Sequence, residues 1–371
     1  MKGEWAVQAE AKKKMLYIMG IDWNWIYQRP QVIAEYLSED YDVTVVYPVK
    51  LWDRCTARRE KEKKEIHHLR IWSLPFQRKI KAIGIAADQY GRLVLRICRR
   101  YEYVYIDYPT YIKYIPTDYA GRLIYDCIDD HVQMCTKETI RREIEKTERA
   151  AIQRSHLLLA SSVSLVRKIQ EQSGNKKVSL IRNGTDFTKI YDAKESCIKK
   201  QYTIGYIGTI AEWFDYGLLE KSAKEHSELS YHLVGPCMIP TPVAHEGISF
   251  DGIVEHSLLQ SYIREYDCLI MPFIVNEIVK SVDPVKLYDY IAFGKCIISV
   301  WYEELEYFKD YVYFYSTYEE YDRLIKELVC SGFPPKYGRQ QQDSFLRENH
   351  WKERYRLIAE AIRQIDEKRQ S

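Results

Sequence analysis

Residues 267–300, DCLIMPFIVNEIVKSVDPVKLYDYIAFGKCIISV, constrain the fold more than any other part of this 371-residue chain. Cys268–Met271 and Cys296–Val300 are short apolar runs, as expected of strands buried on both faces of a parallel sheet. The helix between them is predicted to begin at Asp283-Pro284, because Asp is favoured as an N-cap residue and Pro at the first helical position. Gly294 is predicted to close that helix. The stretch therefore reads as strand, loop, helix and strand, the repeating unit of an α/β protein.

The start of this helix has the residue types of an anion site. Lys286 falls one turn into the helix, where a cation is mildly unfavourable unless an anion lies there too. Asp289 follows three residues later on the same face, where its carboxylate can accept hydrogen bonds from ribose hydroxyls. The spacing predicts a phosphate held jointly by Lys286 and the helix, with Asp289 deeper along the axis.

A glycine turn lies at the end of the predicted strand 202–207, within the sequence IGYIGT at 204–209. Gly208 and Thr209 stand where backbone N–H groups can approach a pyrophosphate closely, ahead of a helix expected to start near Asp215. A tight turn from strand to helix needs glycine for steric reasons as well. The pattern alone leaves both interpretations open.

Strand and helix patterns alternate along the whole chain. In the first half the predicted strands are 15–19, 43–47, 104–106, 123–126 and 157–160, with helices over 30–38 and 137–154; in the second half the strands are 202–207, 230–234, 248–250, 268–271 and 296–300. This alternation predicts two doubly wound, Rossmann-like parallel sheets. The polar stretch 183–200, which begins Asn-Gly, is the best boundary between them, and we expect domains at 1–190 and 191–345 followed by a helix over 346–371.

Composition narrows the class of protein. The length is sufficient for two domains with cores of their own, and a formal net charge of +2 gives no general attraction to nucleic acid. The nine cysteines include no CxxC pair and no zinc-ligand spacing, which indicates a reducing compartment and no structural metal. No apolar run is long enough for a transmembrane helix or a signal peptide, so a cytoplasmic location is expected.

Charge is unevenly distributed over the first half. Between Lys50 and Arg100, Lys and Arg outnumber Asp and Glu by 15 to 5. Such a region can face anionic lipid at the inner face of a membrane. It can equally be a solvated helical face whose long basic side chains cover apolar surface.

Six stretches together resemble the retaining group of GT-B glycosyltransferases that includes teichuronic-acid and exopolysaccharide transferases. The helix at 283–299 is close to the family wording nPvKlyEYlAaGkPvvs. The other stretches, in chain order, are QRPQVIAEYLSEDYDVTVVYP at 28–48, LIYDCIDDH at 123–131, ASSVSLVRKI at 160–169, IRNGTDF at 181–187 and IGYIGTIAEWFDYGLL at 204–219. The resemblance covers most of residues 15–305. It implies the GT-B fold, in which two Rossmann-like domains face a central cleft and the C-terminal helix returns to the first, acceptor domain.

The resemblance also implies where the donor binds. A nucleoside diphosphate sugar is expected in the second domain, with no required cofactor or metal, at Gly208, Thr209, Ser281, Val282, Asp283, Lys286, Leu287 and Asp289. Many relatives carry two glutamates eight positions apart, one near the transferred sugar and one on the ribose. This chain has Ser281 and Asp289 there, so the sugar-side carboxylate is missing and the ribose-side one is shorter.

Asp129-Asp130-His131 follows the strand ending LIYDC and is predicted to reach the edge of the first sheet. In the resemblance His131 matches a position that contacts the transferred sugar, where an imidazole can bind a hydroxyl or stabilise developing charge. We expect His131 and Asp130 to be catalytic. The simpler interpretation is a helix-capping aspartate beside an exposed histidine.

The loop GIDWNWIYQRP at 20–30 is the candidate acceptor site. Trp23 and Trp25 can stack on a sugar face or a lipid headgroup, while Asp22 and Arg29 can hold hydroxyls or phosphate. Alternatively, the tryptophans cover the apolar edge of the first sheet and Arg29 pairs with an acid. Both interpretations fit the sequence.

The resemblance implies a glycosyltransferase of the hexosyltransferase type, and the residue chemistry described above is compatible with it. It would move a sugar from a nucleoside diphosphate sugar to a hydroxyl of a glycan or lipid-linked acceptor in cell-surface polysaccharide synthesis, with retention and without a metal. Two alternatives keep the fold: a sugar-nucleotide epimerase, and a noncatalytic partner protein that binds a nucleotide or an active transferase.

Overall fold

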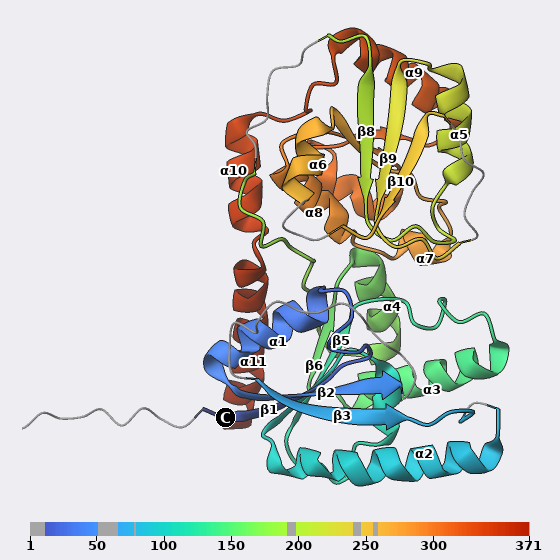
Figure 1. Cartoon of the computed structure of the whole chain (residues 1–371). Coiled ribbons are helices and arrows are strands. Elements are labelled where there is room, and N and C mark those ends of the chain that lie inside the picture. The colour runs from blue at the N-terminus through green and yellow to red at the C-terminus, as the bar shows by residue number, and fades with distance from the viewer. Residues whose placement is uncertain are drawn as a thin grey trace, which may run out of the picture. The chain divides into compact units, whose positions relative to one another are not determined.

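The computed structural model describes residues 12–50, 66–77, 79–190, 198–239, 246–254 and 259–370. The chain divides into two compact units (Figure 1), the first made of Met1–Ser161, Leu165–Ile181 and Tyr355–Ser371 and the second of Ser162–Ser164 and Arg182–Arg354. Apart from Ser162–Ser164, the chain passes from the first unit to the second between residues 181 and 182, whereas the sequence suggested 190. Each unit has a parallel sheet of its own.

The first unit contains a seven-stranded sheet in the order β3-β2-β1-β4-β5-β6-β7, with every pair of strands parallel. Its elements are β1 (Lys14–Ile18), α1 (Arg29–Asp40), β2 (Asp42–Lys50), β3 (His67–Ser73), α2 (Lys81–Val94), η1 (Leu95–Arg100), β4 (Tyr103–Ile106), η2 (Pro109–Lys113), β5 (Arg122–Cys127), α3 (Glu138–Arg154), β6 (Leu157–Ala160), α4 (Val163–Ser173) and β7 (Val178–Leu180). The strand order reverses between β1 and β4.

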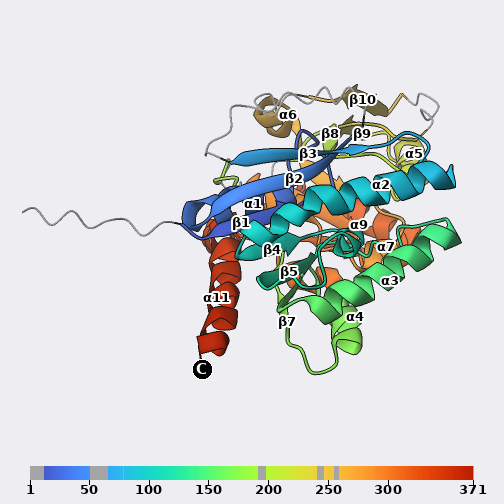
Figure 2. The same ribbon diagram turned by 90° about the horizontal axis from the view of Figure 1, so that it is seen from below.

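Helices cover both faces of this sheet, as Figures 1 and 2 show. α1 lies on one face, and α2 and α3 lie on the other. The C-terminal helix α11 (Trp351–Gln370) packs beside α1 through Tyr355, whose ring stacks on Tyr36 at 5.8 Å and whose hydroxyl bonds Asp40. Burial of both sheet faces explains why the strands read as continuous apolar runs.

The second unit contains a six-stranded parallel sheet in the order β10-β9-β8-β11-β12-β13. Its elements are β8 (Tyr202–Ile207), α5 (Tyr216–Glu225), β9 (Leu229–Val234), β10 (Ile248–Gly252), α6 (Leu259–Glu265), β11 (Cys268–Met271), α7 (Glu277–Lys280), α8 (Val285–Ala292), β12 (Cys296–Val300), η4 (Glu303–Phe308), β13 (Tyr313–Tyr315), α9 (Tyr318–Ser331) and α10 (Arg339–Glu348). Here the order reverses between β8 and β11.

The predicted fold class is confirmed, since both sheets are parallel and doubly wound. The strands β6, β8, β11 and β12 have the bounds that the sequence predicted. The edge strands β3, β7 and β13 and the helix α2 were not predicted. The predicted C-terminal helix is instead two helices, α10 and α11, interrupted at Asn349, whose side-chain amide bonds back to the carbonyl of Phe345.

In open α/β sheets, ligands bind beyond the carboxyl ends of the strands where the strand order reverses. Gly20 follows β1 and Asp107 follows β4 at that position in the first unit. Gly208 follows β8, and the chain from β11 leads to α8, at that position in the second. The fold therefore places the 20–30 loop of the first unit, and Gly208 and Lys286 of the second, at the two points where ligand binding is expected.

Candidate functional site

The turn after β8 is built for close approach of backbone. Gly208 has φ +146°, a conformation that residues with a side chain rarely adopt. Its N–H donates to the carbonyl of Val234, and a Cβ at the neighbouring Gly235 would lie 2.1 Å from the Gly208 carbonyl oxygen. The two glycines therefore let the ends of β8 and β9 meet without side chains between them.

Lys286 lies directly against this turn. A Cβ at Gly208 would be 2.1 Å from Lys286 Cε and 2.8 Å from its Nζ. The ammonium also lies over the rings of Tyr206 and Phe273, at 5.8 and 5.7 Å from their centroids. The structure thus brings together the glycine turn and the lysine, which are far apart in the sequence.

The Lys286 ammonium has no counter-ion within ion-pair distance among the residues that the structure describes. Burial lowers its pKa from the usual 10.5 to about 8, and the charge of Asp289 opposes this shift only in part. A half-buried cation of this kind is costly unless an anion joins it. An anion bound at the turn would supply the missing charge.

The helix α8 begins later than the sequence predicted. Its N-cap is Pro284 and no side chain caps it, so the predicted N-cap role of Asp283 is wrong. The Asp283 carboxylate is buried and accepts hydrogen bonds from the Asn183 N–H at 2.6 Å and the Tyr288 hydroxyl at 3.0 Å. Arg182 Nη1 lies 3.2 Å from it. Burial raises the pKa of Asp283, and the charge of Arg182 opposes that shift. Both carboxylate oxygens are held by residues of the second unit, and a donor contact of Asp283 stays a prediction.

The first backbone N–H groups of α8 have no capping side chain. The earliest N–H groups of a helix have no partner within the helix, and here no side chain replaces one. These groups stand next to Lys286, one residue into the helix. Helix end and ammonium together favour a negative charge at this position.

Asp289 lies on the same helix, with one carboxylate oxygen engaged and one open. Oδ1 accepts a hydrogen bond from the Thr185 hydroxyl at 2.7 Å, and no described residue donates to Oδ2. Burial raises the pKa of Asp289 to about 7, while Thr185 and Lys286 oppose the shift. The open oxygen is the acceptor that ribose hydroxyls would require.

The remaining predicted donor residues are placed as follows. Ser281 is 4% exposed and its hydroxyl bonds the carbonyl of Ile278, and Leu287 lies in the core of the second unit. The carbonyl of Thr209 accepts the Tyr206 hydroxyl at 2.7 Å, and Val282 is half-buried. Leu287 is fully buried because α8 packs against the sheet through this side chain. The side chain cannot contact a ligand, so the predicted donor contact of Leu287 is wrong.

The segment IRNGTDF supplies supporting residues that sequence reasoning did not assign. Asn183 bonds Asp283 through its N–H and donates its side-chain amide to the Asp283 carbonyl at 2.7 Å. Arg182 bridges Asp283 and Glu304, and Thr185 holds Asp289. The segment fixes the start of α8, and its match to the family pattern was the only signal available in the sequence.

In the first unit, Asp130 is occupied by structural contacts. Its carboxylate accepts the Gln133 N–H at 3.1 Å and pairs with Lys168 at 2.8 Å. It is 8% exposed. Both contacts are made by Oδ1, which matches the capping interpretation, while Oδ2 has no hydrogen-bond partner among the described residues. The catalytic role of Asp130 stays a prediction.

Asp129 differs from Asp130 in its contacts. It is partly exposed, and no donor among the described residues reaches its side chain. Burial raises its pKa to about 6, with the charge of Arg29 opposing. The sequence named this residue only as a possible cap, since adjacent aspartates cannot be told apart without their contacts.

His131 is a neutral imidazole. Its Nε2–H donates to the Asp107 carbonyl at 3.2 Å, and its ring lies edge-on to Tyr108 at 4.8 Å. Burial lowers the pKa of His131 to about 4. With Nε2 as donor, Nδ1 is left as a hydrogen-bond acceptor suited to a hydroxyl, and the ring does not supply positive charge near pH 7.

The 20–30 loop is only partly available as an acceptor site. Arg29 is 4% exposed, pairs with both oxygens of Asp126 at 3.0 and 3.1 Å and donates to the Ile181 carbonyl, so its predicted acceptor role is corrected to a buried ion pair. Trp23 is 2% exposed and packs edge-on to His68, which likewise removes it from ligand contact. Trp25 is 43% exposed.

Asp22 is turned toward its own loop. Its Oδ1 accepts the N–H of Asn24 at 2.9 Å and the side-chain amide of the same residue at 3.2 Å. These contacts fix the turn that carries Trp25. Asp22 and Trp25 are therefore the acceptor candidates of this loop that the structure leaves at the surface.

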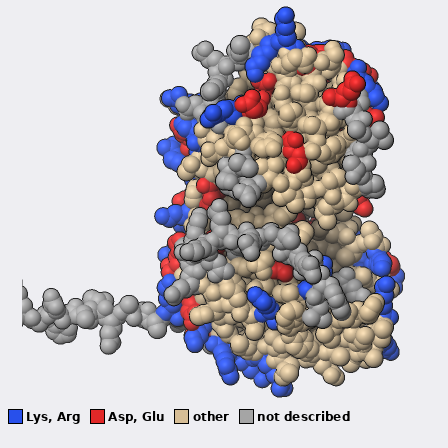
Figure 3. Space-filling view, viewed as in Figure 1, with Lys and Arg blue, Asp and Glu red and all other residues tan. Residues whose placement is uncertain are grey.

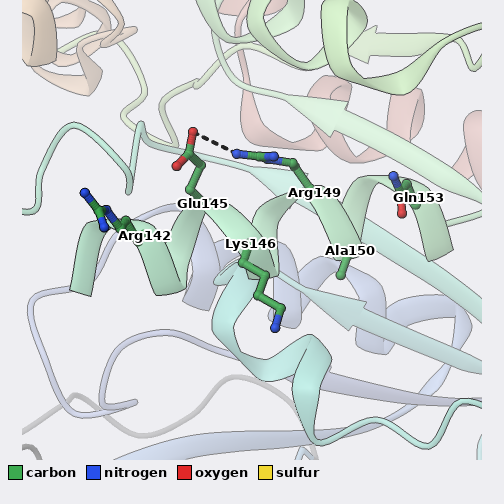
Figure 4. Close-up of a pocket in the computed structure, with 6 residues that line it drawn as sticks. All are labelled: Arg142, Glu145, Lys146, Arg149, Ala150 and Gln153. Atoms are coloured by element: carbon green, nitrogen blue, oxygen red, sulfur yellow. Dashed lines mark ion pairs between the residues drawn. The ribbon is translucent and has the colours of Figure 1, made fainter. Parts of the chain in front are cut away.

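A shallow hollow on α3 lies away from these residues. Figure 4 shows its lining, Arg142, Glu145, Lys146, Arg149, Ala150 and Gln153, all on one helix, with Glu145 and Arg149 paired at 3.0 Å. It contains no residue from a strand end. We therefore do not assign it to the site.

Two further findings concern the described part of the chain. No three His, Cys, Asp or Glu side chains gather there as a metal site would require. None of its helices combines the length and apolar character needed to cross a bilayer.

Comparison with known structures decides the fold. Sucrose-phosphate synthase from Thermosynechococcus elongatus superposes with a TM-score of 0.71 over 95% of this chain and 99% of that chain, at 10% sequence identity. The Anabaena protein HepE, solved in complex with UDP and glucose, gives 0.64 over 95% and 100% at 12% identity. The fold is that of the GT-B glycosyltransferases. At these identities the likeness establishes the GT-B fold alone.

Sequence comparison points in the same direction. No family model matches the chain. A Bacillus subtilis protein, TuaH, named as a teichuronic acid biosynthesis glycosyltransferase, is 23% identical in an alignment of 198 residues that covers 48% of this chain and 50% of that protein. The chain thus matches about half the length of this relative. The GT-B resemblance seen in the motifs is confirmed at the level of the fold.

Proposed function

We propose that this GT-B protein is a glycosyltransferase that moves a sugar from a nucleoside diphosphate sugar to a hydroxyl of a glycan or lipid-linked acceptor in cell-surface polysaccharide synthesis. One observation carries the proposal. The half-buried Lys286 ammonium, without a counter-ion among the described residues, lies against the Gly208 turn where the strand order reverses. A diphosphate is the anion that this position suits best.

The donor would be held by three groups. Its diphosphate would lie against the Gly208 turn and the first N–H groups of α8, with Lys286 beside it. Its ribose hydroxyls would donate to the open oxygen of Asp289, which Thr185 holds in place. The complex of HepE with UDP and glucose supports a uridine nucleotide as the first donor to test.

Lys286 would also serve the chemistry. As the glycosidic bond breaks, negative charge grows on the leaving diphosphate, and a fixed ammonium in a partly dry site stabilises that charge. No metal is needed for this step in our proposal, because Lys286 and the end of α8 provide the positive charge. The leaving phosphate would accept the acceptor proton on the same face of the sugar, giving retention.

The first unit would supply groups for the sugar and the acceptor. The neutral His131 would accept a hydrogen bond from a sugar hydroxyl through Nδ1, and Asp129 would orient the acceptor hydroxyl. Trp25 would give a surface on which a sugar ring can stack. A lipid-linked or polysaccharide acceptor agrees with the role for which TuaH is named.

One observation favours a noncatalytic alternative. Ser281 stands where many relatives have a glutamate, and its hydroxyl is engaged by the Ile278 carbonyl. Such a protein would bind nucleotide without turnover. A sugar-nucleotide epimerase would convert its donor in the absence of any acceptor.

Incubation of the purified chain with radiolabelled UDP-sugars, with and without a lipid-linked glycan fraction, tests the proposal. Transfer of label to the lipid fraction only when acceptor is present, with release of UDP and equal rates in EDTA, is expected. NMR of the product should show the anomeric configuration of the donor. Conversion of the donor alone would identify an epimerase, and binding without any product would support the noncatalytic alternative.

A further inference from the structure

The helix α2 and the turn before it expose large apolar side chains on the surface of the first unit. Phe76 is 62% exposed, Ile80 48%, Ile85 51% and Leu93 66%. Leaving side chains of this size in water is unfavourable relative to burying them. Four such side chains lie within 18 residues of one segment, which indicates a binding surface.

The outward direction of these side chains follows from how α2 packs. Its inner side is formed by Tyr90, Gly91 and Val94; Tyr90 and Val94 pack on the core, and a Cβ at Gly91 would touch the Tyr114 ring at 3.0 Å. In a helix of 3.6 residues per turn, Ile85 points away from that side. The helix is thus apolar on the sheet side and also presents apolar groups to the outside.

Cations accompany the apolar side chains. Lys79, Lys81, Arg92 and Arg96 are all exposed, and none has a carboxylate within ion-pair distance in the described part of the chain. The one acid among the described residues from 66 to 100 is Asp88, which pairs with Lys113 at 3.0 Å and accepts the Tyr114 hydroxyl. Figure 3 shows Lys and Arg along the lower edge of the first unit, where α2 runs in Figure 1.

The turn before the helix holds Phe76 outward in an unusual conformation. Phe76 has φ +58°, which is uncommon for a residue with a bulky side chain. The N–H groups of Lys79 and Ile80 both donate to its carbonyl at 2.8 Å and hold the turn in this form. The backbone of Phe76 is therefore strained, and its exposed ring lies just before the start of α2.

We propose that Phe76, Ile80, Ile85 and Leu93 with Lys79, Lys81, Arg92 and Arg96, here called the α2 face, bind the surface of an anionic lipid bilayer. Helices that lie in the membrane interface combine projecting apolar residues with neighbouring lysines and arginines in this way. Anionic headgroups complement the unpaired cations. A second copy of the chain is disfavoured, because a symmetric contact would bring the same four cations together.

The α2 face lies within the basic region 50–100, for which the sequence indicated contact with anionic lipid as one of two interpretations. Residues 51–65, which carry six of the basic side chains of that region, lie outside the described residues. The α2 face alone already supplies four cations and four apolar groups. Membrane binding at α2 does not depend on the transfer reaction, although a lipid-linked acceptor would explain its use.

Vesicle flotation of the full chain tests the proposal. Vesicles of phosphatidylcholine with about a third phosphatidylglycerol are expected to carry the protein upward, whereas vesicles of phosphatidylcholine alone retain little. Substitution K79E/K81E should reduce partitioning by about tenfold or more, since each basic residue near an anionic surface contributes about a factor of five. I85S/L93S should reduce it while leaving the salt dependence in place.

The matched control is R141E/K146E, which reverses two exposed cations on α3 of the same unit and should leave partitioning unchanged. Melting curves and the nucleotide-induced shift of each variant verify that the fold and the donor site are intact, so loss of one property is separable from loss of the other. Absence of binding to anionic vesicles, or equal loss in K79E/K81E and R141E/K146E, would overturn the proposal. So would a dimer in light scattering that I85S/L93S abolishes while vesicle binding persists.

Discussion

Lys286 fills the space beside Gly208 that a side chain at position 208 would need. Its Cε lies 2.1 Å from an ideal Cβ built on Gly208. The contact joins the turn after β8 to the helix that follows β11. It places a charged side chain where a diphosphate is expected.

Gly208→Ala should abolish nucleotide binding. The methyl group would displace Lys286, and φ +146° is unfavourable for alanine by about 1–3 kcal/mol. Calorimetric titration with UDP and a melting curve measure the two effects. Gly217→Ala is the matched control, since its Cβ would meet only Asp215 Oδ1 at 3.6 Å, and it should keep parental affinity.

Nucleotide affinity should fall as the pH rises above about 8. The pKa of Lys286 is about 8 in the free protein, and a bound diphosphate would raise it, because the anion favours the charged ammonium. The complex therefore takes up a proton when it forms near this pH, and affinity is highest below the free pKa. Titration from pH 6.5 to 9.5 in buffers of different ionisation enthalpy measures the uptake. Affinity that stays constant across this range would contradict the assignment.

Asp129→Asn and Asp130→Asn should have different effects. Asp129 has no donor among the described residues, so its replacement should lower turnover by at least tenfold and leave the melting temperature unchanged. Asp130 caps a turn and pairs with Lys168, so its replacement should cost about 1 kcal/mol of stability. Initial rates and urea denaturation of the two variants separate the roles. Equal loss of turnover without loss of stability in Asp130→Asn would restore that residue as catalytic.

Arg29→Met should destabilise the first unit by about 3–5 kcal/mol, because the buried carboxylate of Asp126 would lose its paired cation. The double variant Arg29→Met/Asp126→Asn should recover part of that loss. Urea denaturation of the single and double variants measures the coupling. A stable single variant with weakened acceptor binding would support the original prediction that Arg29 contacts the acceptor.

The elements that were predicted correctly are those whose own residues form a recognisable local pattern. Cys268–Met271 and Cys296–Val300 are buried on both faces and therefore read as strands without further information. Gly208 and Lys286 stood out because a glycine turn and a helix start each have local patterns. The edge strand β3 and helix α2 were missed, since partial exposure blurs the periodicity of both.

The incorrect assignments depended on distant partners. Asp283 was predicted to cap α8, but Asn183 and Arg182, about a hundred positions earlier, hold its carboxylate. Arg29 was predicted to face a ligand, and its partner Asp126 lies 97 positions away. A local pattern cannot distinguish a carboxylate or guanidinium that serves a site from one consumed by long-range packing.

Thermal stabilisation by nucleotides tests the central claim most directly, with the parent protein and Lys286→Met compared in the presence of UDP, GDP, ADP, CDP and their sugars, with and without Mg²⁺. Without ligand at pH 7, Lys286→Met should be at least as stable as the parent, because it removes a partly buried cation whose pKa is lowered in the fold. One family of nucleotides should raise the melting temperature of the parent by several degrees, independently of Mg²⁺ and not at all in the variant. Equal shifts in both proteins, or no shift with any nucleotide, would contradict a donor site at Lys286 and Gly208.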